Sequence, residues 1–288
     1  DDSYDDGGFS STTTAAFSVD GYLGYVDDAD NVVDDAVAAG YSFQIDLNTS
    51  FTGEDSLDIS LDAGTGETEG IAEFDGNTGG DTLVVDGVSY TFPIGDKVTA
   101  FVGADTDGSA LFTTACVYGG PGNLLDDCAN VNAGITGGLT ALGASYEIGG
   151  GFTGAFGAQT GNASVFTEES ADAYALNLAY TADSYGLSLT YGVTESVDAN
   201  LALDNEYDKY TALNAYYTPE GSLPSISVGY EVGDLGGEAD DSDETASFMV
   251  GLTWDEVGPG SAGIAVGHSN TAEAADELYQ YEAYYSYP

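Results

Sequence analysis

Carboxylates dominate the residues of this chain that could do chemistry. The 288 residues include 50 Asp and Glu, 2 Lys and Arg together and one His, for a net charge of -48. A Ser-His-acid hydrolase or a phosphoryl-transfer site needs basic groups that the chain hardly offers. Paired carboxylates for glycoside hydrolysis could be chosen almost anywhere, and no pattern selects one pair. The composition therefore argues against an enzyme, and it makes nucleic acid a very poor partner because nothing could neutralise phosphates.

Four aspartates lie where carboxylates could serve another purpose. Asp20, Asp46, Asp58 and Asp62 fall on rows of small or polar residues that alternate with apolar ones. Alternate side chains of a strand point to opposite faces, so these acids are separated from the apolar rows. Lining a water-filled interior, they would favour cations, an effect that weakens as salt screens the charge. Hydrogen bonding to neighbouring Ser and Thr in a plugged interior is the alternative.

Two cysteines occur in one Gly-, Asn- and Asp-rich stretch. Cys116 and Cys128 are expected to form a local disulfide, with two free thiols as the alternative. Asp126 and Asp127 lie between them, within the longest link of the chain, 106–138. Folded inward, this link would narrow a pore and present carboxylates to it; packed over the mouth, it would be a surface loop. A bridge would stiffen it in either case.

No cofactor and no metal site is predicted. With no His or third Cys nearby, the cysteines do not suggest zinc. The stretches "DDADNVVDD" (27–35) and "EADDSDE" (238–244) lack the Gly of an EF-hand loop, so we expect solvated acidic loops.

Alternation with a period of two residues positions these groups, and helical periodicity is almost absent. In "AYALNLAYTADSYGLSLTYG" (173–192), Tyr and Leu alternate with small or polar residues on both sides of a four-residue turn. Short and long links follow each other strictly, as in an up-and-down meander. About fourteen strands are predicted, near 15–25, 37–49, 56–64, 83–93, 97–105, 139–148, 152–159, 172–181, 184–194, 209–218, 223–233, 245–254, 261–268 and 277–287.

The placement of aromatic residues favours a membrane barrel over a soluble sandwich. Aromatic residues end the apolar rows and leucines lie between, as two interfacial girdles would require. The lipid-facing girdle is predicted to include Tyr174, Tyr180, Tyr185, Tyr191 and Trp254. We therefore expect an all-β, up-and-down antiparallel transmembrane β-barrel of fourteen to sixteen strands, with short turns at one end and long loops at the other. It would occupy residues 15–288, after an acidic flexible lead-in at 1–14.

Three stretches carry a resemblance to a known family. "FQIDLNTSFTGEDSLDISLDAGTG" (43–66), "VDGVSYTFPIGDKVTAFVGA" (85–104) and "ELYQYEAYYSYP" (277–288) resemble, in order, segments of cyanobacterial outer-membrane porins, the carbohydrate-selective-porin-like family that often carries an S-layer-homology domain. The resemblance implies a trimeric diffusion porin of sixteen strands. We expect neither the S-layer-homology domain nor the final hairpin within this sequence, and acids stand where relatives carry many Arg and Lys, which speaks against sugar or anion selectivity.

The sequence thus predicts an outer-membrane porin that passes small hydrophilic solutes and inorganic ions and prefers cations. Its partners would be outer-membrane lipid and two further copies of the chain, in a Gram-negative-type cell. The charge of -48 points to a saline source, a marine cyanobacterium, because salt reduces self-repulsion. The alternative is a surface β-protein that assembles into a layer, tube or appendage and buries its aromatic rows between subunits.

Overall fold

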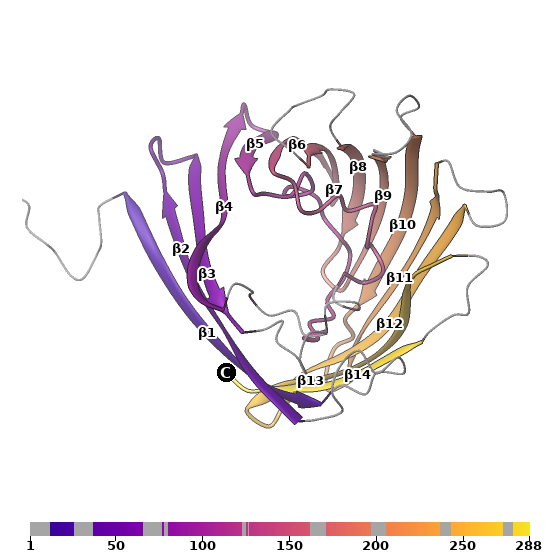
Figure 1. Cartoon of the computed structure of the whole chain (residues 1–288). Coiled ribbons are helices and arrows are strands. Elements are labelled where there is room, and N and C mark those ends of the chain that lie inside the picture. Colours follow the sequence, from indigo (N-terminus) through magenta and orange to yellow (C-terminus); the bar gives the residue numbers. More distant parts are fainter. Residues whose placement is uncertain are drawn as a thin grey trace, which may run out of the picture. The chain divides into compact units, whose positions relative to one another are not determined.

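A computed structural model describes residues 12–25, 37–65, 77, 80–122, 125, 127–161, 171–196, 206–236, 243–272 and 279–288. The chain divides into two compact units, Asp1–Thr106 and Asp107–Pro288, here called the N-terminal and C-terminal units. The described residues form fourteen strands and no helix. Figure 1 labels these strands along the chain. Accordingly, these residues include no helix long and apolar enough to cross a membrane.

The N-terminal unit is an antiparallel meander in which each strand pairs with the next in sequence. Its strands are β1 (Thr13–Tyr25), β2 (Val37–Thr49), β3 (Ser56–Gly64), β4 (Gly80–Ile94) and β5 (Val98–Ala104). One register shift, at Ser60 and Leu61 of β3, interrupts its pairing with β4.

The C-terminal unit continues the same pattern, again with antiparallel pairing of consecutive strands. Its strands are β6 (Thr140–Gly149), β7 (Phe152–Thr160), β8 (Asp172–Thr181), β9 (Tyr185–Ser196), β10 (Glu206–Tyr217), β11 (Ser225–Asp234), β12 (Glu244–Val257), β13 (Gly260–Ala272) and β14 (Gln280–Ser286).

These strands confirm the all-β, up-and-down fold predicted from the alternation, and short links alternate with long ones as expected. The largest difference is at β12 and β13, which are longer than predicted because their ladder extends from the pair Thr245 and Ala272 to the pair Val257 and Gly260. Only Gly258 and Pro259 remain for the turn, and Gly258 has a φ of 65°, which favours glycine.

The short turn between β2 and β3 is organised by one carboxylate, that of Asp55. Its Oδ1 accepts hydrogen bonds from the backbone N–H groups of Phe51 and Thr52, at 2.9 and 2.8 Å, and from the hydroxyl of Ser50 at 2.8 Å. Its Oδ2 accepts one from the Tyr90 hydroxyl of β4 at 2.6 Å. The Tyr90 hydroxyl, followed by the Thr52 N–H, holds the pKa of Asp55 well below its usual range.

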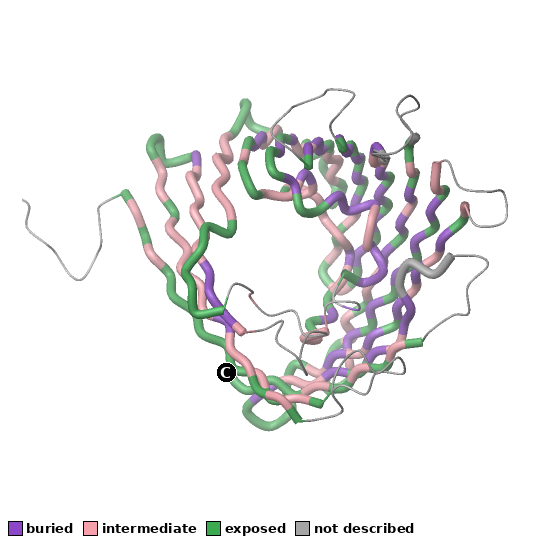
Figure 2. Tube along the Cα trace, viewed as in Figure 1, coloured by how far each residue is buried: buried purple, intermediate pink, exposed green. Residues whose placement is uncertain are grey.

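Burial in the C-terminal unit is the reverse of that in a soluble protein. Figure 2 shows buried residues alternating with exposed or half-buried ones along β8 to β12. On β9, Leu187 and Leu189 are 48% and 46% exposed, whereas Ser188 and Thr190 between them are at most 2% exposed. The apolar row therefore faces outward from the sheet, and the polar row is covered.

Candidate functional site

The covered face of the C-terminal unit carries a row of small and polar side chains from strand to strand. Its buried polar members, other than acids, are Asn177, Ser188, Thr190, Asn214, Ser225, Ser227, Thr245, Ser247 and Thr253. Most of them have an outward-pointing Leu, Ile, Val or Tyr at a neighbouring position of the strand, whereas Ser247 lies between Ala246 and Phe248. The polar face is therefore what lies inside the fold, and it is the surface on which the long link before β6 rests.

Residues 107–138 of this long link are here called the covering segment, and those that the structure describes (107–122, 125 and 127–138) lie against that polar face in irregular backbone (Figure 1). Gln159 of β7 holds the beginning and the end of the segment together. The N–H of Gly108 donates to its Oε1 at 2.7 Å, and its Nε2 donates to the carbonyl of Thr136 at 2.6 Å. Next, Asn177 of β8 accepts from the N–H of Thr113 at 3.1 Å and donates to its carbonyl at 3.2 Å. Strand side chains thus supply hydrogen bonds that an irregular backbone cannot make to itself.

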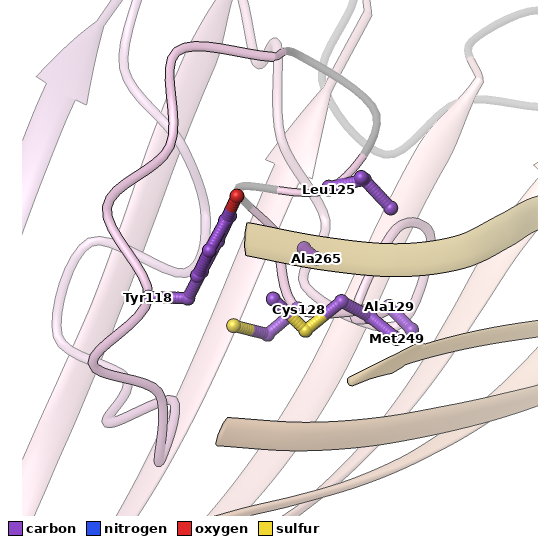
Figure 3. Close-up of a cluster of buried hydrophobic side chains, with 6 residues drawn as sticks. All are labelled: Tyr118, Leu125, Cys128, Ala129, Met249 and Ala265. Carbon is purple, nitrogen blue, oxygen red and sulfur yellow. The ribbon is translucent and has the colours of Figure 1, made fainter. Parts of the chain in front are cut away.

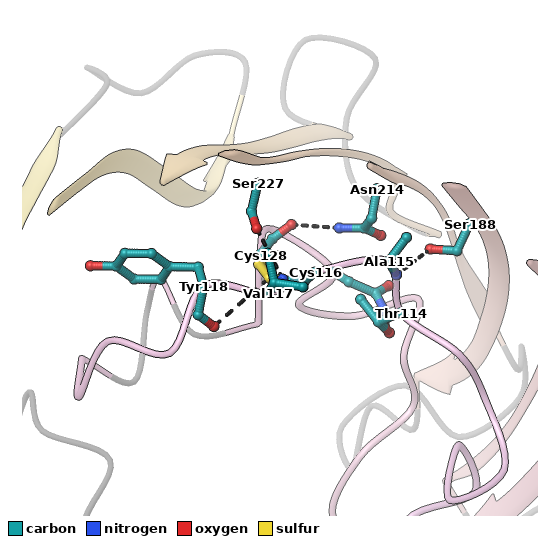
Figure 4. The surroundings of a disulfide bond; sticks show 10 residues. Thr114, Ala115, Cys116, Val117, Tyr118, Cys128, Ser188, Asn214 and Ser227 are labelled. Carbon is teal, nitrogen blue, oxygen red and sulfur yellow. Dashed lines mark hydrogen bonds between the residues drawn. A yellow bond between two sulfur atoms is a disulfide. The ribbon is translucent and has the colours of Figure 1, made fainter. Parts of the chain in front are cut away.

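The middle of the covering segment is anchored in the same way (Figure 4). The N–H groups of Ala115 and Val117 donate to the hydroxyls of Ser188 and Ser227, each at 2.9 Å. The carbonyl of Cys128 accepts from Nδ2 of Asn214 at 2.6 Å. The contacts reach β9, β10 and β11, so the covering segment crosses the sheet rather than following one strand.

A disulfide ties two parts of the covering segment together. Cys116 and Cys128 are bonded, with a Cα–Cα separation of 6.3 Å and a sequence separation of 12 residues. Figure 3 shows Cys128 in a small buried cluster with Met249 of β12 and Ala265 of β13. The cluster also contains Tyr118, Leu125 and Ala129 of the segment itself. Apolar packing therefore supplements the hydrogen bonds where the disulfide meets the sheet.

Glycines on the strands give the covering segment the space that it occupies. A Cβ at Gly157 of β7 would overlap the carbonyl oxygen of Gly108, and one at Gly229 of β11 would overlap that of Cys128. At Gly192 of β9, a Cβ would lie 2.9 Å from the backbone of Ala133. Close approach of a second backbone is a recognised reason for glycine inside a strand.

The far side of the covering segment is bound by β14. The hydroxyl of Tyr118 donates to a carboxylate oxygen of Glu282, and the rings of Tyr118 and Tyr284 meet edge to face with centroids 5.7 Å apart. Burial, together with the hydrogen bond to Glu282, raises the pKa of Tyr118 above its usual range. The phenol therefore remains a neutral donor to Glu282 at physiological pH.

The covering segment also has a hollow of its own. The hollow has a volume of about 320 Å³ and is lined by Ser109, Phe112, Thr114, Cys116, Tyr118, Asp127, Asn130, Gly134 and Thr136. Asp127, one of the predicted pore-lining acids, is exposed at its rim. Asp126, the other acid predicted there, lies outside the described residues. Most of the side chains that line the hollow are neutral hydrogen-bond donors and acceptors, and Asp127 is the acid among them.

The four predicted strand acids share one face of the N-terminal unit. Their cross-strand partners are Ser42 for Asp20, Ser60 for Asp46, Asn48 for Asp58 and Gln44 for Asp62. Directly opposed residues point to the same side of a sheet, so β1, β2 and β3 present these carboxylates together. Asp20 is exposed, whereas Asp62 is 8% exposed and its Oδ1 has no hydrogen-bond partner among the described residues.

Two of these acids are hydrogen-bonded to polar neighbours. Asp46 accepts from Gln44 and Ser60 at 2.8 Å each. Asp58 accepts from Asn48 at 2.6 Å and from Ser56 at 2.7 Å. The sequence suggested either a negative lining of a water-filled interior or carboxylates hydrogen-bonded to their neighbours. The structure contains features of both, because the acids share one face and neighbouring amides and hydroxyls donate hydrogen bonds to them. Their combined effect on a passing ion remains a prediction.

The tyrosines predicted for the girdle lie at the ends of the outward rows. Tyr174, Tyr185 and Tyr191 are exposed, and Tyr180 and Trp254 are partly exposed. At the short-turn end, Phe152, Tyr180 and Tyr185 are ring neighbours, with centroids 4.7 and 5.7 Å apart. Amphipathic rings grouped at a strand end suit a membrane–water interface.

Sequence reasoning missed three carboxylates that organise the structure: Asp55, Glu231 and Glu282. Glu231 and Glu282 were recognisable as acids on polar rows, between Tyr230 and Val232 and between Tyr281 and Ala283. Their partners belong to irregular backbone, which has no periodicity to place it. The two acidic stretches 27–35 and 238–244 lie almost wholly outside the described residues. Elsewhere among the described residues, no cluster of three or more potential metal ligands is formed.

Comparison with known proteins identifies porins as structures with this fold. No family model and no curated protein matches the sequence. A high-pH structure of OprB from Pseudomonas putida has a TM-score of 0.59 at 13% identity, covering 90% of this chain and 76% of that one. A mutant of the Rh. blastica porin has a TM-score of 0.50 at 14% identity, covering 93% and 89%. At these identities the similarity shows the fold alone, which is that of porin β-barrels.

Proposed function

We propose that this chain forms an outer-membrane diffusion channel, a porin that passes small hydrophilic solutes and inorganic ions. The observation that carries the proposal is the reversed burial, with leucines outward and serines, threonines and asparagines inside. Soluble proteins rarely expose apolar patches of this extent, whereas a barrel in lipid must do so. The fold shared with outer-membrane porins supports the same conclusion.

We further propose that the channel prefers cations. The chain has only two Lys and Arg residues against 50 Asp and Glu. Lys97 is exposed in the short turn after β4. Lys209 lies on the outward row of β10, where its Nζ is 3.7 Å from a carboxylate oxygen of Asp234. Two lysines are too few to offset 50 carboxylates, and a negative lining attracts positive ions.

The selectivity is tested by the reversal potential in a planar bilayer under a KCl gradient. We expect the wild type to reverse toward the K⁺ equilibrium potential, with a weaker preference at high salt. Replacing Asp46 and Asp58 by Asn should reduce the preference. The matched control is Asp234→Asn, which removes a charge from the outward row and should change little. A preference for Cl⁻ in the wild type would contradict the proposed acidic lining, but it would not contradict the proposal that the chain forms a channel.

The membrane location is tested separately, by dependence on detergent. A barrel should require detergent for solubility and migrate differently on a gel before and after heating. The surface-assembly alternative predicts a water-soluble layer, tube or appendage without this heat-dependent shift. The trimer and the cyanobacterial source rest on the sequence resemblance and charge, and we propose them on that basis. Crosslinking of the purified protein in detergent should give a trimer; a monomer would contradict it.

A further inference from the structure

Glu231 is the most deeply buried acid among the described residues, at 1% exposure. It lies on the inward row of β11, where the other members are Ser225, Ser227, Gly229 and Gly233. The row therefore places a single carboxylate among small residues, directly under the covering segment. A charged group at such a position costs free energy unless hydrogen bonds compensate its lost hydration.

The covering segment donates hydrogen bonds to both carboxylate oxygens of Glu231. Its Oε2 accepts from the backbone N–H groups of Ala133 and Asn132, at 2.8 and 3.0 Å. Its Oε1 accepts from Nδ2 of Asn132 at 2.9 Å. Two consecutive N–H groups and one side-chain amide thus converge on one carboxylate, in a fork that uses both of its oxygens.

The carboxylate has no basic partner that could replace these donors. Lys209, the basic residue of the C-terminal unit, points outward from β10 toward Asp234. The N–H groups of Asn132 and Ala133 therefore supply the compensation that Glu231 needs. The dependence is mutual, because two adjacent N–H groups of irregular backbone obtain their acceptor from the sheet.

The bond to Glu231 differs in kind from the other anchors of the covering segment across β8 to β11. Those anchors use neutral groups: Asn177, Ser188, Asn214 and Ser227. Hydrogen bonds to an ionised acceptor are roughly twice as strong as neutral ones. The packing is also tight here, since Ala133 is fully buried and its backbone lies against the Gly192 position.

We infer that Glu231 is the positioning residue that fixes the covering segment on the sheet and so determines how far the segment projects into the permeation path. The effect on conduction rests on the proposed function, whereas the anchoring of the covering segment rests on the hydrogen-bond geometry. Glu231 itself is covered and does not touch the permeating ion. Its contribution to conduction is indirect, through the position of Asn132, Ala133 and the residues that follow them.

The test uses the full-length protein folded in detergent and measures hydrogen–deuterium exchange of the amides of Asn132 and Ala133. In Glu231→Gln, an amide NH₂ replaces one acceptor and faces N–H donors, so we expect exchange roughly 10- to 100-fold faster. Asp234→Asn is the matched control, with the same loss of charge on the same strand, and should leave both amides protected. Unchanged protection in Glu231→Gln would overturn the inference.

A second pair of variants separates positioning from a general loss of folding. Asn132→Asp leaves β11 intact and places a second carboxylate against Glu231, so it should also release the segment. Combining it with Glu231→Gln lets the introduced glutamine amide donate to the new carboxylate, which should restore protection above that of either single variant. A double variant no better than the singles would overturn the inference.

Single-channel recordings relate the position of the segment to conduction. Both single variants should show noisier currents with excursions to higher conductance, and the double variant should be quieter. Variants as quiet as the wild type, in a wild type that conducts, would overturn the proposed link to conduction. Should the wild type form no channels at all, the proposed function fails, while the exchange data still decide whether Glu231 positions the segment.

Discussion

Replacing Gly229 by Ala should push the covering segment away from β11. Gly229 lies on the inward row, where a Cβ would overlap the carbonyl oxygen of Cys128 and lie 2.7 Å from its carbonyl carbon. It would also lie 2.8 Å from Nδ2 of Asn214. Ordinary van der Waals contacts of a Cβ lie at 3.4–4 Å, and a backbone carbonyl has no side-chain rotamer by which to move away. Either the segment or the strand must therefore move.

The cost of this movement can be worked from the groups that it separates. The hydrogen bond from Asn214 to the Cys128 carbonyl is 2.6 Å long, and Asn214 is fully buried. The other side-chain atom of Asn214, Oδ1, already has no partner among the described residues. Losing the remaining bond would leave a buried amide unsatisfied, at a cost of about 1–3 kcal/mol. The docked arrangement should therefore lose roughly 5- to 150-fold in its equilibrium with a displaced one.

The assay is single-channel recording, with folding checked by heat-dependent gel migration. Gly229→Ala should fold and show excursions to a higher conductance that are rare in the wild type. The control is Gly154→Ala in β7 of the same sheet, where the nearest atoms to a new Cβ are 3.7 and 3.9 Å away. A folded Gly229→Ala channel with the conductance and noise of the wild type would refute the reasoning, since the overlap would then be relieved without moving the segment.

Other contacts support three further predictions. Replacing Cys116 and Cys128 by Ser removes a crosslink across 12 residues, which should leave the strands intact and speed amide exchange in the covering segment; unchanged exchange would show that the sheet contacts suffice. Asp55→Asn should destabilise the fold at neutral pH. The pKa of Asp55 is lowered in the fold, so the stabilisation by its carboxylate is present above the unfolded pKa of about 4 and is lost as pH falls below that value. The free energies of unfolding of the wild type and the variant should therefore converge in acid. Leu187→Arg, on the exposed outward row of β9, should impair folding into lipid by about 2–4 kcal/mol, whereas equal insertion yields would argue against a lipid-facing row.

The strands were predictable because their signal is local. Each strand repeats every two residues, and rows such as Tyr185, Leu187, Leu189 and Tyr191 identify one face without any knowledge of the neighbours. The alternation also assigned Asp46, Asp58 and Asp62 to a common side once the strands were paired. It did not determine which face points outward, because a sandwich core and a lipid-facing surface produce the same pattern.

The position of the covering segment was not predictable in detail. Its length and its cysteines marked 106–138 as unusual, yet its contacts depend on single polar residues spread over β7 to β14. Glu231 illustrates the difficulty: its partners are backbone N–H groups of Asn132 and Ala133, which every sequence possesses. Glycines such as Gly157 and Gly229 were a usable signal, since glycine inside a strand often marks the approach of another backbone.

The central claim is that the chain is a channel, and planar-bilayer recording of the purified, heat-modifiable wild type tests it most directly. We expect discrete current steps with a reversal potential shifted toward that of K⁺ under a KCl gradient. Protein that is folded and inserted, yet gives no steps over many recordings, would contradict a diffusion pore and leave the polar face and its covering segment as a closed plug.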